Sequence, residues 1–495
     1  MTDRRRVQGF FEQAINGDES QMVAFVKELP NMLKEVPHNK IHESYIPFLV
    51  YWVPRNNTKI CLELVKVLPT LFAADGPFKD VMSFIEALTA AGNEEVMTAL
   101  TDPISALPQD ALYEIVSGLI RTKYDIVRCF GVRFIGGIED KSKQEELLGC
   151  LVRDTSYKVR KSVILIMNQL DKVLASRVAE ALRTDLNPRI RSLLATVASF
   201  YQYFSDSFTD AIVADYDWSV RASVAIGIVR LPDPQQAYQI GSRLVLDNVW
   251  QVKLASLRSL TSIFNSHEPG TIDPESLFSI LPMVLEYNKT KIITASIDTM
   301  FAMLRQKPTK NKDMDSFICS IFTNQPYDIR LHFLGSCDAT NIQYFREALR
   351  PFFPDALGKI ATSDKWKLRL KLMEIAVKIT ELFDEQEITE SVTECCRRLA
   401  TDKAEYVREL ASKQFVTLSA KKEEGIPQFV ENLVQGASFR ERQIGARILA
   451  EFYAVYQDEG IRSTIIKDLD QLSNDPCSNV AYVAKEMLKK IQAER

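Results

Sequence analysis

Few residues in this chain have the type and spacing that catalysis or metal binding needs. Its 495 residues include four histidines, His38, His42, His267 and His332. Two of them precede a glutamate, and histidine and carboxylate side chains bind iron or zinc when several gather in space. Because the pairs at 42–43 and 267–268 are 225 residues apart, we interpret them as unrelated surface residues. We expect no metal and no cofactor.

The cysteines and the standard catalytic motifs give the same indication. None of the eight cysteines has the C-x-x-C spacing of a metal or redox site. Cys395 and Cys396 are adjacent on one predicted helix and point about 100° apart, which does not suit a shared metal. Phosphate-binding loops, nucleophile elbows and zinc-protease motifs are also missing from the sequence. We therefore expect a protein that is not an enzyme and whose thiols are reduced.

Charge and hydropathy exclude two further classes of function. Lys and Arg number 61 and Asp and Glu 65, a net charge of -4, which argues against a nucleic-acid-binding protein. The most apolar stretch, 45–54, is far shorter than the roughly 18 residues of a membrane span, and no secretion signal opens the chain. We expect a location in the cytoplasm, with the nucleus as a second compartment.

A repeated aspartate organises the chain. Six copies read Asp, four residues, an aliphatic residue and usually a base, and begin at Asp154, Asp185, Asp215, Asp247, Asp402 and Asp475. Weaker copies centre on Val23, Ile60, Val96, Val127, Ile292, Ile329, Leu368 and Glu441, which gives 14 units whose centres are 30 to 40 residues apart. Self-similarity at this period indicates an array of helical repeats.

The apolar residues on both sides of each aspartate have helical spacing. Val159 is followed by Val163, Ile166, Met167 and Leu170, which lie on one face of a helix. A second apolar helix ends three residues before the aspartate, whose carboxylate can accept the unpaired amides of the following helix. We therefore predict an all-α fold, a right-handed α-α superhelix of about 14 helical hairpins that stack into one continuous core.

The lengths of the connections divide this array into two parts. Units before Val252 are mostly short, and long connections follow at 265–274 and 305–315. We predict N-terminal units over residues 1–264 and C-terminal units over 265–495, within one continuous solenoid.

Aromatic residues recur two positions before the aliphatic anchor. They fill this slot in six of the 14 units, where the 9% aromatic share of the chain would give about one: Tyr157, Trp218, Trp250, Tyr327, Trp366 and Phe439. The turns of stacked hairpins lie along one edge, so we expect these rings to form a ridge. The rings either pack over the preceding turn as hydrophobic staples or bind a partner, because Trp and Tyr are favoured anchors of interfaces.

The turn aspartate and the base six residues later resemble the HEAT repeat, an armadillo-like helical fold. In that family the acid of one turn pairs with the base of the next along the stack. The resemblance implies a structural ladder of Asp154, Arg160, Asp185, Arg191, Asp215, Arg221, Asp247, Lys253, Asp402 and Arg408. It also leaves open a metal-dependent hydroxylase, because deoxyhypusine hydroxylase is a HEAT-like enzyme whose iron site uses His-Glu pairs.

Residues 365–370, Lys-Trp-Lys-Leu-Arg-Leu, resemble the K-W-R-V-R-L of the 65 kDa regulatory scaffold family of protein phosphatase 2A. Segments 45–50, 402–409 and 480–488 are also similar to that family. The resemblance implies that one set of residues contacts a phosphatase catalytic subunit: Lys365, Trp366, Lys367, Tyr406, Phe439, Arg440 and Asn479. It implies that a second set contacts a regulatory subunit: Tyr157, Trp218 and Trp250.

The resemblance predicts a non-catalytic scaffold. Its C-terminal units would hold the catalytic subunit of a serine/threonine phosphatase, and its N-terminal units would hold an exchangeable regulatory B-type subunit, in a heterotrimer. The chain departs from the family in having 14 units instead of 15, short middle units, and Ala481 where the family has arginine. The alternative is a general HEAT-repeat adaptor or a transport receptor of the importin-beta type.

Overall fold

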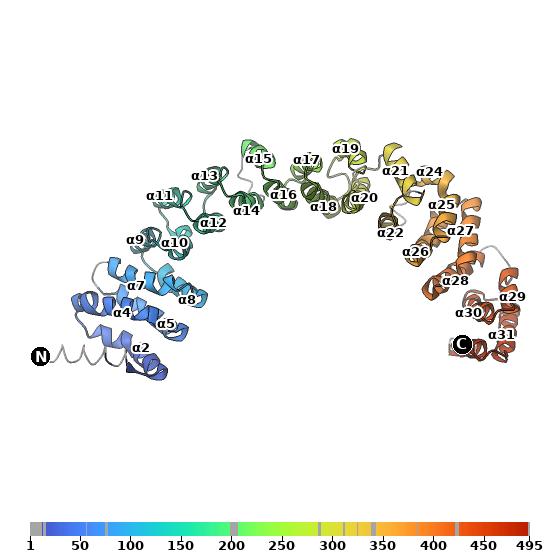
Figure 1. Ribbon diagram of the computed structural model, residues 1–495, viewed down its shortest axis with the longest axis horizontal. Helices are drawn as coiled ribbons and strands as arrows, with labels where there is room; N and C mark the ends of the chain where they lie inside the picture. Colours follow the sequence, from blue (N-terminus) through green and yellow to red (C-terminus); the bar gives the residue numbers. More distant parts are fainter. Residues whose placement is uncertain are drawn as a thin grey trace. The chain divides into compact units, whose positions relative to one another are not determined.

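The chain is built from helical hairpins (Figure 1). The computed structural model describes residue 12 and residues 16–55, 57–74, 78–198, 206–285, 289–309, 312–323, 325–337, 343–383, 385–420 and 425–493. All regular secondary structure in these residues is helical, which confirms the predicted all-α repeat fold. The chain divides into two compact units, Met1–Pro232 and Asp233–Arg495.

The first unit contains the hairpins up to residue 232. The first helices of its hairpins are α4 (Ile46–Trp52), α7 (Phe78–Ala90), α9 (Gln109–Leu119), α11 (Lys141–Leu151), α13 (Lys172–Leu182) and α15 (Asp206–Val213). The second helices are α2 (Glu19–Lys34), α5 (Thr58–Val65), α8 (Glu94–Ser105), α10 (Asp125–Val132), α12 (Tyr157–Leu165), α14 (Pro188–Ala198) and α16 (Trp218–Gly227). Two short helices, α3 (His38–Lys40) and α6 (Leu68–Phe72), lie between them.

The second unit repeats this arrangement. Its first helices are α17 (Pro234–Val245), α19 (Glu275–Leu285), α21 (Lys312–Thr323), α25 (Phe353–Ala361), α27 (Gln386–Leu399), α29 (Gln428–Val434) and α31 (Glu459–Ser473). The second helices are α18 (Trp250–Ser266), α20 (Thr290–Gln306), α22 (Tyr327–Ser336), α26 (Trp366–Phe383), α28 (Glu405–Ser419), α30 (Phe439–Val455) and α32 (Ser478–Ala493). The short helix α24 (Arg346–Leu349) precedes α25. Each second helix of this unit contacts the second helix of the following hairpin.

The aliphatic anchors of the repeat fix the start of each second helix. All 14 predicted anchors lie in second helices, and in α12, α16, α18, α26, α28 and α30 the anchor is the third residue. Val159, Val220 and Val407 are fully buried there, and Leu368 is 1% exposed. Because the anchor points into the core between the two rows of helices, the two residues before it face the opposite way. The repeat therefore exposes the first turn of each second helix.

The short units owe their length to short second helices. In the first unit α10, α12 and α16 have 8, 9 and 10 residues, whereas α18 and α20 in the second unit have 17 each. Each of the three short helices is followed by a 3-10 turn, and Asp140, Asp171 or Asp233 then caps the next first helix. The connection at 265–274 lies inside the second unit, and the chain divides at 232/233 instead of at 264/265.

Arginine and aspartate side chains link successive hairpins within each unit. Five such pairs are present in the described residues: Arg128–Asp154, Arg160–Asp185, Arg191–Asp215, Arg369–Asp402 and Arg442–Asp475. In each pair Nε donates to Oδ2 at 2.6 or 2.7 Å and Nη2 donates to Oδ1 at 2.8 to 3.0 Å. These are bidentate, charge-assisted hydrogen bonds between largely buried side chains.

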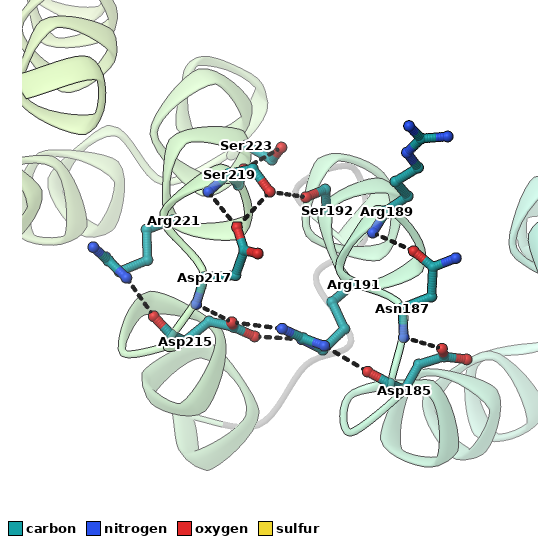
Figure 2. Close-up of polar contacts among 10 residues, drawn as sticks. All are labelled: Asp185, Asn187, Arg189, Arg191, Ser192, Asp215, Asp217, Ser219, Arg221 and Ser223. Atoms are coloured by element: carbon teal, nitrogen blue, oxygen red, sulfur yellow. Dashed lines mark hydrogen bonds and ion pairs between the residues drawn. The ribbon is translucent and has the colours of Figure 1, made fainter. Parts of the chain in front are cut away.

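The direction of this ladder is the reverse of the expected one. Each base pairs with the acid of the following hairpin, so Arg160 reaches Asp185 and Arg191 reaches Asp215. The expectation that an acid pairs with the next base was wrong, because the arginine projects from the second helix towards the following turn. Figure 2 shows Arg191 between its own turn and that of Asp215.

The spacing of six residues has a direct cause. The remaining nitrogen of each ladder arginine, Nη1, donates to the carbonyl six residues earlier, as from Arg191 to Asp185 at 2.5 Å and from Arg221 to Asp215 at 2.6 Å (Figure 2). The aspartate carboxylate in turn accepts the N–H two residues later, as Asp215 does from Asp217 at 2.8 Å. One arginine thus satisfies a helix-end carbonyl of its own hairpin and the acid of the next hairpin.

Asp247 and Lys253 are two further members of the predicted ladder, in the turn before α18 and in α18 itself. Asp247 accepts the N–H of Val249 at 2.7 Å, and Lys253 donates to the carbonyl of Val245 at 3.1 Å. Burial lowers the pKa of Lys253. Arg128, Arg369 and Arg442 belong to the ladder but were not predicted, because the aspartate is missing from the turn of their own hairpins.

Candidate functional site

The histidine and cysteine candidates do not form a metal site. His42 is buried with Nδ1 3.0 Å from Asp80 Oδ2, and His267 Nδ1 lies 2.8 Å from the carbonyl of Ile263. No group of three or more potential metal ligands occurs among the residues that the structure describes. Burial raises the pKa of Cys395 to about 12 and raises that of Cys396 as well.

The aromatic slot of the repeat is the first residue of the second helix. Tyr157, Trp218, Trp250, Tyr327, Trp366 and Phe439 each begin their helix. Tyr157, Trp218, Trp366 and Phe439 are 40 to 50% exposed, whereas Trp250 and Tyr327 are half-buried. A ring at this position is therefore partly exposed to solvent.

In the second unit the residues assigned to a catalytic subunit lie on one edge. We call this surface the C-terminal turn edge; it consists of the residues just before or at the start of α26, α28, α30 and α32, namely Lys365, Trp366, Lys367, Tyr406, Phe439, Arg440 and Asn479. All seven are exposed. The four helices contact one another in succession, so their first turns are neighbours along the stack.

Two aromatic rings from the first two hairpins of this edge stack on each other. The ring centroids of Trp366 and Tyr406 are 6.4 Å apart and their planes differ by 27°. Tyr406 is 70% exposed, so the pair offers a wide apolar face to solvent. An offset stack of this kind fixes both side chains in place before a partner arrives.

Basic side chains lie along the same edge as the stacked rings. Lys367 Nζ lies 5.9 Å from the centre of the Trp366 ring, and Arg440 Nη2 donates to the carbonyl of Lys403 at 3.1 Å. That second contact joins the turn of one hairpin to the start of the next second helix. The C-terminal turn edge is therefore an apolar strip with positive charge along it.

The residues assigned to a regulatory subunit belong to both compact units. Tyr157 and Trp218 lie in the first unit at the starts of α12 and α16, whereas Trp250 belongs to the second unit. Lys289 Nζ lies 4.7 Å from the centre of the Trp250 ring.

Two exposed apolar residues of the first unit were missed by the sequence analysis. Leu186 is 93% exposed and Tyr216 is 80% exposed. Each directly follows a ladder aspartate, at the tip of a turn, and the guanidinium of Arg191 lies 4.4 Å from the centre of the Tyr216 ring. The sequence could have indicated both exposed residues, because each is an apolar residue directly after a turn aspartate.

The chain resembles several long helical proteins of known structure. It is 11% identical to Kap121p over 97% of this chain and 53% of that one, with a TM-score of 0.44. Importin beta is 11% identical over 99% of this chain and 70% of that one, with a TM-score of 0.40. A homology model of the AP-3 complex is 10% identical over 99% of this chain and 94% of that one, with a TM-score of 0.44. The chain thus spans about half the length of Kap121p. No protein-family model and no curated protein matches the sequence.

The hairpins and the ladder decide the fold. Paired helices stack on the pair that follows, and five buried arginine–aspartate pairs in the described residues join one turn to the next. The chain has a HEAT-repeat fold. In the described part of this HEAT-repeat protein, no helix is both long and apolar enough to cross a membrane.

Proposed function

We propose that this HEAT-repeat protein is a non-catalytic adaptor that binds another protein through its C-terminal turn edge. The observation that carries the proposal is the exposed stack of Trp366 on Tyr406 with basic side chains beside it. Interface hot spots are enriched in Trp, Tyr and Arg, and they cluster where a partner can exclude water from them. The adaptor would act in the cytoplasm, with the nucleus as a second compartment.

A more specific form of the proposal names the partner. We propose the catalytic subunit of a serine/threonine phosphatase, because the residues that resemble the phosphatase 2A scaffold at 365–370 lie at the start of α26, the first helix of the C-terminal turn edge. All seven residues implied for that contact are exposed on this edge. A B-type subunit would bind the exposed aromatic residues of the first unit, Tyr157 and Trp218, to complete a heterotrimer.

Surface plasmon resonance with immobilised full-length protein tests both forms. Replacing Trp366 and Tyr406 together by alanine should weaken binding of a purified phosphatase catalytic subunit by about 30-fold or more, as for removal of a hot spot worth about 2 kcal/mol. Tyr51→Ala is the matched control, because Tyr51 is an equally exposed aromatic residue, 58% accessible, on α4 of the first unit.

The outcomes separate the partner from the surface. If the wild-type chain does not bind the catalytic subunit, the phosphatase proposal is wrong. Affinity capture from cells with mass spectrometry then tests the adaptor itself, since its partners should be lost in the Trp366/Tyr406 double variant and kept in Tyr51→Ala. Capture of the same proteins by both variants would show that the edge is not the interface.

A transport receptor is the other kind of adaptor that the alternative includes. The karyopherin Kap95p binds RanGDP. Binding of purified Ran to the full-length chain, with no binding of the phosphatase catalytic subunit, would favour that function over the phosphatase scaffold.

A further inference from the structure

The ladder arginines all form the same set of contacts where the next hairpin supplies an acid. One side of the guanidinium binds a carbonyl of its own hairpin, and the Nε and Nη2 side binds the aspartate of the following turn. Pairing also changes the pKa of the arginine: the hydrogen bonds that Arg191 donates to Asp215 raise its pKa, and those that Arg442 donates to Asp475 do the same.

Two ladder arginines of the second unit face a turn without an acid. After α22 the aspartate position is Ser363, and after α28 it is Gly436. Arg330 and Arg408, which precede these turns, form no ion pair within the described ranges, and burial lowers the pKa of both. Nε and Nη2 of Arg330 are buried without a hydrogen-bond partner in the described residues. Arg408, in contrast, lines an open cavity.

The surroundings of Arg408 are built like the other positions of the ladder. Its Nη1 donates to the carbonyls of Asp402 at 2.8 Å and Lys403 at 2.9 Å. Nη1 of the paired arginines Arg160 and Arg191 donates to the corresponding carbonyl. The Nε and Nη2 atoms of Arg408 can therefore bind a carboxylate with two parallel hydrogen bonds, as they do in those two arginines.

In the turn that contains Gly436, Glu441 forms one of the two contacts that the missing aspartate would form. The N–H of Ser438, which would donate to a ladder acid at position 436, donates instead to Oε2 of Glu441 at 3.1 Å. That oxygen lies 2.6 Å from where a Cβ of residue 436 would be, so glycine is needed for Glu441 to fold back. Glu441 forms no ion pair with Arg408, so it replaces the missing acid towards the amide but not towards the arginine.

The cavity beside Arg408 is predominantly positive. It measures about 290 Å³ and is lined by residues of α28, α30 and α32: Arg408, Glu409, Ser412, Lys413, Ile444, Arg447, Glu451, Met487 and Lys490. Arg447 is paired with Glu409 at 3.0 Å, and Lys490 lies 3.7 Å from Glu451. These pairs cancel in charge, so Arg408 and Lys413 are left to attract an anion.

We propose that Arg408 binds a carboxylate side chain of a partner protein, which takes the place of the ladder acid that is missing at Gly436. Arg408 and Tyr406 both belong to the first turn of α28, so a glutamate or aspartate bound to Arg408 would lie within one helical turn of the C-terminal turn edge. The inference rests on the proposed function in one respect, that the ligand belongs to a protein. It predicts an acidic residue next to the apolar residues that cover Trp366 and Tyr406.

Fluorescence anisotropy of labelled peptides with the full-length chain tests the site. A hexapeptide of glutamate should bind the wild type more tightly than one of glutamine at low salt. Arg408→Ala should weaken binding of the glutamate peptide about tenfold or more, and Arg408→Lys should not restore it, because lysine lacks the planar fork. Lys485→Ala is the control for net charge, because Lys485 is exposed on α32 and does not line the cavity.

A second pair of variants supplies the missing acid from the chain itself, at position 436. Gly436→Asp with Glu441→Val restores the complete pattern of aspartate, four residues, aliphatic residue and base. This variant should lose the glutamate peptide and raise the melting temperature relative to Gly436→Asn with Glu441→Val, which has the same shape without the charge and should still bind the peptide. Because the predicted loss of binding comes with a gain in stability, misfolding cannot imitate the result.

Several outcomes would overturn the proposal. They are equal affinity for the two hexapeptides, equal losses in Arg408→Ala and Lys485→Ala, or full binding by the Gly436→Asp variant. Binding of a phosphoserine hexapeptide through Arg408 without binding of the glutamate peptide would assign the site to phosphate instead. The Trp366/Tyr406 double variant should keep the glutamate peptide. If that variant also keeps its partner proteins, the proposed function fails while the carboxylate site stands.

Discussion

The ladder predicts a large and local loss of stability when one arginine is removed. Arg191 and Asp215 have side chains that are only 3% and 7% exposed, and two hydrogen bonds of 2.7 and 3.0 Å join them. Arg191→Ala leaves a buried carboxylate without its partner and also removes the bond to the carbonyl of Asp185. Breaking a buried pair from one side costs about 3 to 5 kcal/mol.

The loss should be confined to the neighbouring hairpins, because repeats interact mainly with their neighbours. Hydrogen exchange followed by mass spectrometry can measure it on peptides that cover α14 and α16. At about 1.4 kcal/mol per factor of ten, Arg191→Ala should speed exchange there by more than about a hundredfold. The control is Arg133→Ala, whose pair with Glu94 is exposed on both sides and should cost less than about 1 kcal/mol.

A double variant tests the reason for the loss. Arg191→Met with Asp215→Leu removes both charges and should cost less than Arg191→Ala alone, since no unpaired carboxylate stays buried. If Arg191→Ala accelerates exchange no more than Arg133→Ala does, the ladder does not stabilise the stack and this reasoning is refuted.

Three shorter predictions concern protonation and reactivity. Asp298 lies 2.8 Å from His332 and raises the pKa of the histidine above its usual 6.5. The pair should therefore stabilise the contact of α20 with α22 at low pH, and this stabilisation should be lost as the pH rises through the raised pKa. NMR titration of Asp298→Asn should show a lower pKa for His332. Arg442 of α30 holds the pKa of Asp475 below its usual 3.8. The stabilisation by this pair is therefore present above that pH and is lost in acid. Asp475→Asn should abolish the acid-dependent increase in hydrogen exchange of α32. Iodoacetamide at pH 8 should modify the exposed Cys150 and leave Cys395 intact, as peptide mass spectrometry would show, because burial raises the pKa of Cys395 to about 12.

The period of the sequence predicted the hairpins because 12 of the 14 units bury an aliphatic anchor at the same position. Val159 and Val407 are fully buried at the third position of their helices, and no other contact is needed to place them. The exposure of Trp366 follows from the same geometry, since it comes two residues before an anchor. The stack of Trp366 on Tyr406 could not be predicted, because it depends on how far two successive hairpins are apart.

The direction of the ladder and its open positions needed the structure. In the sequence, an aspartate and an arginine six residues apart look like partners. In the structure Arg160 donates to the backbone carbonyl of Asp154, six residues earlier, and its ion pair is with Asp185 of the next hairpin. Gly436 resembles an ordinary loss of the repeat pattern in the sequence. Only the folded turn shows that Glu441 occupies part of the missing acid's place and that Arg408 keeps a free side.

The two-sided use of each ladder arginine makes the hairpins interchangeable. Each junction that carries the arginine–aspartate pair presents the same donors and requires the same carboxylate. Such a boundary carries no information about which repeat comes next. Removal of residues 185–214 would place Arg160 opposite Asp215 and re-create the pair that it forms with Asp185. A gene that encodes such a chain can lose or duplicate whole hairpins without a matching change elsewhere, which lets the length of the array change in evolution independently of its binding edge.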